Sequence, residues 1–133
     1  MGILSVLIAA AASYAFGAFW YMTLAKPWMA ASGVTQEMAK SADGKQNMTP
    51  FIISAIASIL VAGMMRHVFG MADITGAYKG AMAGLGLGLF IVSPWIMTCY
   101  AFGMRPRNLT LIDAGYATIG CTIMGLVLGL FAG

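Results

Sequence analysis

The chain has 133 residues, of which 61% are hydrophobic and 8% are charged. Soluble domains carry roughly 25% charged residues, so seven basic and four acidic side chains are too few to cover a water-soluble globule of this length. The net charge of +3 is small, and no basic cluster is present, which excludes a typical nucleic-acid-binding surface. We therefore expect an integral membrane protein that has lipid as its solvent.

The first apolar run extends from residue 3 to about residue 24, close to the ~20 residues that a membrane-spanning helix needs. No lysine or arginine precedes it, and its apolar core is longer than that of a cleaved signal peptide, so we predict a retained helix. A polar loop over residues 26–49 follows. Within this loop Thr35 is predicted to begin a short surface helix that ends at Gly44.

Three further apolar runs predict helices over residues 51–69, 76–102 and 109–131. Together with the first run they predict one membrane domain, an all-α four-helix transmembrane bundle with both termini on one side. Pro94 cannot donate a hydrogen bond to the carbonyl of Phe90, which predicts a kink in the third helix. Cys99 and Cys121 lie at different depths, so no disulfide between them is expected.

The positive charges divide unequally between the two ends of this bundle. Only Arg66 and Lys79 lie on the side of the termini, whereas the loops on the opposite side hold Lys26, Lys40, Lys45, Arg105 and Arg107. The positive-inside rule then predicts a bacterial inner-membrane protein with both termini in the periplasm.

Small residues recur every four positions in the third and fourth predicted helices. The members of this stripe are Gly76, Gly80, Gly84 and Gly88 in the third helix, and Gly125 and Gly129 in the fourth. Without side chains, neighbouring helix backbones can approach closely. The stripe is open to three interpretations, which are packing within one chain, a homo-oligomer interface, and the lining of a narrow pathway.

Two charged residues inside the apolar runs, Arg66 and Asp113, are the strongest candidates for a functional role. Arg66 either extends to the lipid headgroups or forms an anion or partner site, with Asp73 as a plausible ion-pair partner. Asp113 is either an acid near a helix start that pairs with Lys26, Arg105 or Arg107, or a site for a cation or proton.

Hydroxyl groups gather around the expected kink at Pro94, where freed carbonyls can bind a ligand or water. Two of them, Thr98 and Tyr100, complete a candidate polar site with Arg66 and Asp113. No nucleotide-binding, nucleophile or metal-ligand motif occurs, so we expect no enzyme, no cofactor and no metal.

Several short segments resemble the domain of unknown function 1761 family of small bacterial four-helix membrane proteins. They comprise Phe19-Trp20-Tyr21, Lys26-Pro27-Trp28-Met29, Gly33-Val34-Thr35-Gln36-Glu37, Arg105-Pro106, Leu109, Ile112-Asp113-Ala114-Gly115-Tyr116 and Met124-Gly125. Family members often carry asparagine where Asp113 stands and histidine where Ala117 stands. The resemblance implies the four-helix topology and brings no activity with it.

Two classes of function agree with the sequence. In the first, a self-assembling bundle, most simply a homo-oligomer, provides a binding or permeation site for a small solute or ion. In the second, the chain is a non-catalytic accessory or scaffold subunit of a larger membrane complex. In both, its partners are the lipid bilayer and other membrane-embedded chains, with no nucleic acid.

Overall fold

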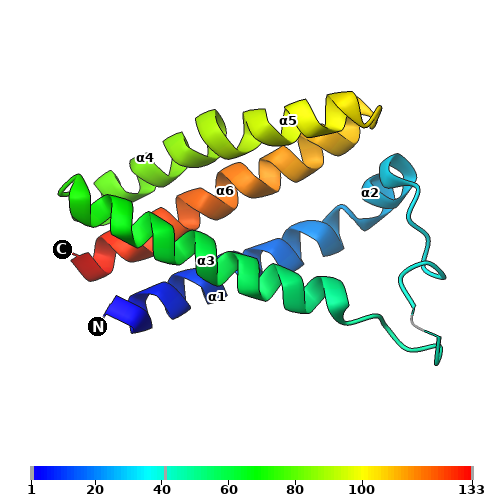
Figure 1. Cartoon of the computed structure of the whole chain (residues 1–133), viewed down its shortest axis with the longest axis horizontal. Helices are drawn as coiled ribbons and strands as arrows, with labels where there is room; N and C mark the ends of the chain where they lie inside the picture. The colour runs from blue at the N-terminus through cyan, green and yellow to red at the C-terminus, as the bar shows by residue number, and fades with distance from the viewer. Residues whose placement is uncertain (1, 41, 133) are drawn as a thin grey trace.

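The computed structural model describes residues 2–40 and 42–132, and these residues form helices and loops without a strand. Four helical spans are long and apolar enough to cross a membrane, which confirms the predicted all-α membrane bundle. The spans are α1 (Gly2–Thr23), α3 (Thr49–Met71), the composite span Ala77–Phe102 and α6 (Arg107–Ala132). The composite span contains α4 (Ala77–Leu87), a π-helical turn η1 (Gly88–Val92) and α5 (Ser93–Phe102). Both chain ends lie at the same end of the bundle (Figure 1).

The first loop contains a short helix, α2 (Ala25–Ser32), where the sequence predicted polar loop. The predicted surface helix beginning at Thr35 is wrong, because residues 36–39 form turns and the Thr35 hydroxyl accepts the Met38 N–H at 3.2 Å. Pro27 lacks the N–H that would continue α1 through this point, so the helix breaks and restarts as α2. Gly33 ends α2 in the left-handed region, with φ of 78°.

The third span changes its hydrogen-bonding pattern just before Pro94. The turn η1 inserts one π-helical stretch between α4 and α5, and Pro94 stands at the start of α5. A missing proline N–H leaves an unpaired carbonyl one turn earlier, and a local π turn is one way in which a helix absorbs such a defect. The irregularity expected at Pro94 therefore lies over the preceding turn.

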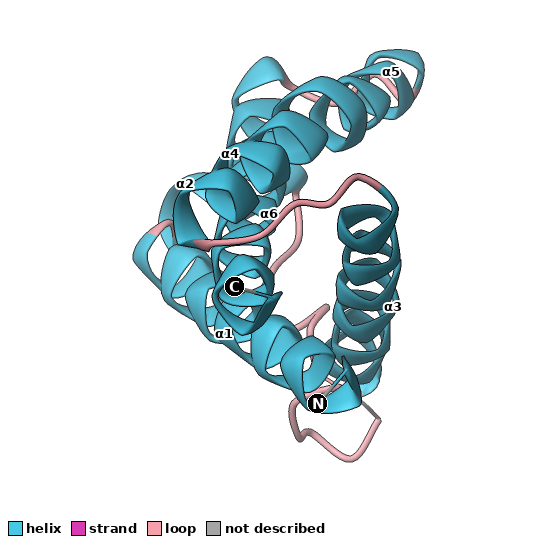
Figure 2. Cartoon of the chain, turned by 90° about the vertical axis from the view of Figure 1, so that its left-hand side faces the viewer, coloured by secondary structure: helices cyan, strands magenta, loops and turns pink. Residues whose placement is uncertain are grey.

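The α6 helix occupies the centre of the molecule. It contacts α4, η1 and α5 on one side and α1 on the other, while α3 packs mainly against α1. Figure 2 shows α3 set apart from α4 and α5. The helices thus follow the spatial order α3, α1, α6 and α4–α5. The face of α3 that points away from α1 is not covered by another helix of the described chain.

Glycines allow the third span and α6 to touch through their backbones. A β-carbon on Gly80 would collide with the carbonyl oxygen of Gly125, and one on Gly84 would collide with that of Cys121. At the end of this contact the Gly76 N–H donates to the Gly129 carbonyl at 2.9 Å. The stripe is covered by a helix of the same chain, which favours intramolecular packing over an interface between subunits.

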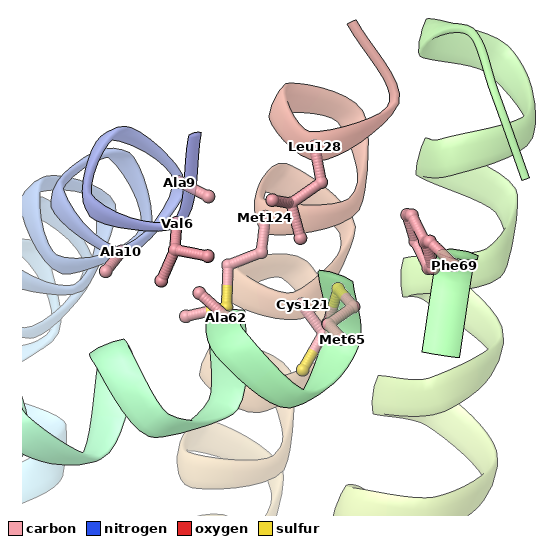
Figure 3. Packing of buried hydrophobic residues seen from close by; sticks show 9 residues of the cluster. All are labelled: Val6, Ala9, Ala10, Ala62, Met65, Phe69, Cys121, Met124 and Leu128. Carbon is pink, nitrogen blue, oxygen red and sulfur yellow. The ribbon is translucent and has the colours of Figure 1, made fainter. Parts of the chain in front are cut away.

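The buried apolar core is small and lies where α1, α3 and α6 meet (Figure 3). It consists of Val6, Ala9, Ala10, Ala62, Met65, Phe69, Cys121, Met124 and Leu128. Large apolar side chains elsewhere point outward, for example Ile3 and Leu60, which are 79% and 68% exposed. Such surfaces are unfavourable in water and favourable against acyl chains, so they form the lipid-facing side of the bundle.

Candidate functional site

Two tyrosines from different spans donate hydrogen bonds to one carboxylate. Asp113 lies in the second turn of α6, and its Oδ1 accepts the Tyr21 hydroxyl at 2.6 Å. Its Oδ2 accepts the Tyr100 hydroxyl at 2.5 Å. Tyr21 comes from the end of α1 and Tyr100 from the end of α5, so the carboxylate joins three helices at the end of the bundle that carries the first loop. All three residues are half-buried.

Aromatic rings surround this group on the side of α1 and α2. The Tyr21 ring packs edge-on against Tyr116, with centroids 5.3 Å apart, and against Trp28, with centroids 6.0 Å apart. Trp20 donates its indole N–H to the carbonyl of Ile112 at 3.0 Å, directly beside Asp113 in sequence. The rings hold the Tyr21 phenol in place beside the carboxylate.

No base forms an ion pair with Asp113 within the part of the chain that the structure describes. The interpretation of Asp113 as an acid paired with Lys26, Arg105 or Arg107 is wrong, because none of these side chains forms an ion pair with it. Arg105 instead donates to the carbonyl of Ser32 at 2.7 Å, which ties the last loop to the end of α2. The phenols are more rigid than lysine or arginine side chains, and they reach the carboxylate from helix ends.

The chemistry of this group is that of an oxygen-rich site with one negative charge. An ionised carboxylate only accepts hydrogen bonds and has about four lone-pair positions, of which the two phenols occupy two. The two phenol oxygens retain lone pairs of their own. Hard oxygen ligands favour hard cations, and a single charge balances a monovalent cation or a proton. Among the described residues, no cluster of three or more His, Cys, Asp or Glu side chains forms a multidentate metal site.

The structure brings together only part of the candidate polar site. Tyr100 and Asp113 are bonded, whereas Thr98 is exposed and its hydroxyl donates to the carbonyl of Pro94 at 3.1 Å in the same helix. Arg66 lies at the opposite end of the bundle, against Gly2. The expected ion pair between Arg66 and Asp73 is not formed.

Sequence reasoning did not assign Tyr21 to the site, because its position at the end of an apolar run is typical of the aromatic belt at a membrane surface. It also missed the contact between Ser93 and α6. The buried Ser93 hydroxyl lies 2.8 Å from that of Thr118 and donates to the carbonyl of Ala114 at 3.0 Å. Its position just before a proline inside an apolar helix was the available signal, since a buried hydroxyl needs a partner.

The four spans, their lipid-facing side chains and the half-buried carboxylate define a multi-pass membrane protein. Residues 4–129 match the family described as Protein of unknown function (DUF1761), and the chain belongs to that family. No curated protein and no solved structure matches the chain.

Proposed function

We propose that this protein holds a monovalent cation or a proton at Asp113 in the bacterial inner membrane, as a binding or permeation site for a small ion. One observation carries the proposal, namely a half-buried carboxylate in a membrane span that has two phenol donors and no ion-pair partner among the described residues. Ionisable groups at membrane depth are costly and commonly mark ion pathways or proton relays.

The position of Asp113 supports an ion that enters from one end. Asp113 lies six residues after Arg107 in α6, so it is about 9 Å along the helix from Arg107 at ~1.5 Å per residue. Under the positive-inside rule this end faces the cytoplasm and both termini face the periplasm. An ion at Asp113 would then sit at the cytoplasmic mouth of the bundle.

Self-association is part of the proposal and requires a surface other than the glycine stripe. That stripe is covered by α6, whereas the outer side of α3 exposes Ile52, Ile56 and Leu60. A homo-oligomer would form through this uncovered face of α3.

The test is ion flux into liposomes that contain the purified protein, with an internal indicator for Na⁺ or for protons. We expect Asp113→Asn to remove most of the flux, because asparagine keeps the shape of the side chain without its charge. Glu37→Gln is the matched control, since Glu37 is an exposed loop carboxylate paired with Lys40 at 3.4 Å. Equal flux in Asp113→Asn and the unmodified protein would overturn a transport role for this residue.

The uncovered α3 also favours a second candidate function, that of a non-catalytic accessory or scaffold subunit. In that case α3 binds a different membrane protein, and Asp113 serves only to join α1, α5 and α6. Gentle extraction followed by native mass measurement separates the two. A stoichiometric foreign partner supports the accessory subunit, and a complex made of this chain alone supports the autonomous ion site.

A further inference from the structure

A hollow of about 200 Å³ opens at the end of the bundle that carries both termini. Its walls come from the start of α1, the end of α3, the connection between α3 and α4, and the end of α6, which Figure 1 shows meeting at this end. Most of its lining is apolar, and Arg66 and Asp73 are its two charged residues. It lies at the other end of the molecule from Asp113 and has no part in the proposed ion site.

One wall of the hollow is positive. The Arg66 guanidinium is packed so closely against α1 that a β-carbon on Gly2 would stand 2.8 Å from its Nη2. Gly2 belongs to the first turn of α1, where free backbone N–H groups add further positive charge. Within residues 2–40 and 42–132 no acceptor bonds this guanidinium and no carboxylate pairs with it. A planar guanidinium with its donors free is suited to a carboxylate or phosphate.

The opposite charge is held on the connection between α3 and α4. Asp73 has a φ of 54°, in the left-handed region, and backbone hydrogen bonds fix the residues that follow it. The Ile74 N–H donates to the carbonyl of Phe69 and the Gly76 N–H to that of Gly129, each at 2.9 Å. Asp73 thus stands at a defined position in the same hollow as Arg66 without being paired to it.

The remaining lining matches a ligand with an apolar part. Phe69 and Leu128 are buried residues that line the hollow, and Phe131, which also lines it, is 42% exposed. An occupant with separated opposite charges can meet both ionic residues, while its apolar part continues into the bilayer along Phe131.

We propose that this hollow binds a zwitterion, with its anionic group on Arg66 and its ammonium on Asp73. The headgroup of an aminophospholipid, which carries a phosphate and a primary ammonium, has this chemistry and is present at the depth of the hollow. A free zwitterionic solute has the same two charges, so the two sources are distinguished by experiment.

The test uses the full chain in detergent, with native mass spectrometry to measure binding of added phosphatidylethanolamine and phosphatidylglycerol. Both lipids carry a phosphate and only the first carries an ammonium. We expect phosphatidylethanolamine to bind about tenfold more tightly, as one charge-assisted hydrogen bond allows. Asp73→Asn should remove this preference, and asparagine tolerates the left-handed backbone at this position. Arg66→Gln should weaken the binding of both lipids about tenfold.

Lys79→Gln is the control, because Lys79 is an exposed cation in α4 that does not line the hollow. Soluble O-phosphoethanolamine is then added as a competitor. Displacement of the lipid identifies a free zwitterion as a sufficient ligand, and failure to displace it identifies the lipid as the source. Equal binding of the two lipids by the unmodified protein, or variants at Arg66 and Asp73 that behave like Lys79→Gln, would overturn the proposal.

Discussion

Replacing Gly84 tests whether backbone contact between α4 and α6 holds the fold together. A β-carbon at this position would collide with the carbonyl oxygen of Cys121, and would stand 3.0 Å from its carbonyl carbon and 3.2 Å from the Cα of Gly125. These atoms belong to a helix backbone and cannot rotate away as a side chain can. Gly84→Ala therefore requires the two helices to separate.

The size of the effect follows from the geometry of this contact. Carbon atoms pack best at about 3.5–4.0 Å, so α4 must move away from α6 by roughly 0.5–1 Å, which forfeits about a quarter to a half of the local dispersion energy. Overpacking by one methyl group typically costs about 1–3 kcal/mol. Alanine recovers about 0.5–1 kcal/mol through its better helix propensity. We expect a net loss of about 1–2 kcal/mol for Gly84→Ala, and unfolding of the α4–α6 pair for Gly84→Leu.

Gly86→Ala is the matched control, because Gly86 lies in the same helix and a β-carbon on it meets nothing within 4 Å. The assay uses circular dichroism to measure helicity while the protein is titrated from mild detergent into dodecyl sulfate. Gly86→Ala should unfold at the same midpoint as the unmodified chain or later. Equal stability of the two alanine variants would show that the contact at Gly84 does not limit how closely α4 and α6 pack. If Gly84→Leu stays folded but no longer forms an oligomer, the glycine stripe would instead be an interface between subunits.

Further predictions concern the buried hydroxyl pair, the tyrosine donors and the membrane orientation. Ser93→Ala leaves the Thr118 hydroxyl short of a partner and should lower the free energy of unfolding by about 1–2 kcal/mol in the same titration; no change would mean that the pair contributes nothing. Tyr21→Phe removes a donor from a charged acceptor and should cost about 1.5–3 kcal/mol, whereas Tyr14→Phe removes only an exposed bond to the Phe51 carbonyl and should cost less than 1 kcal/mol in comparison. A reporter enzyme that works only in the periplasm should be active when it is fused to the C-terminus. Activity of a cytoplasm-specific reporter at the same position would show that the predicted orientation is reversed.

The helices were predictable because bilayer thickness and hydropathy act on each segment separately. Apolar runs of the right length cross the membrane whatever their neighbours are, which explains why the length and hydropathy of each run predicted the four spans. The α2 helix was not predictable in the same way. Its lysine, proline and tryptophan give no clear apolar period, and its start depends on the interruption of α1 by Pro27.

The candidate site depends on contacts between helices, and sequence spacing does not specify these. Asp113 and Tyr100 are 13 residues apart and were both identified, whereas Tyr21 is 92 residues from Asp113 and reaches it only because α1 packs on α6. The expected pairing of Asp113 with bases failed for the same reason. Arg105 lies close in sequence, but the end of α2 offers its guanidinium a carbonyl acceptor.

The glycine stripe illustrates how packing limits the possible functions. Its spacing predicted a close helix contact without identifying the partner helix. The partner is α6 of the same chain, so any second subunit must use another surface.

The most direct test of the account is whether a cation or proton at Asp113 changes the fluorescence of the tryptophans around it. Trp95 is 75% exposed and is replaced by phenylalanine, so that of the three tryptophans only Trp20 and Trp28 report. The protein is titrated with Na⁺, K⁺ and protons at constant ionic strength. We expect a saturable change in fluorescence with at least one of the three ions, and we expect Asp113→Asn to lose this change. No saturable change with any of the three, or a change that persists in Asp113→Asn, would contradict the proposed ion site at Asp113.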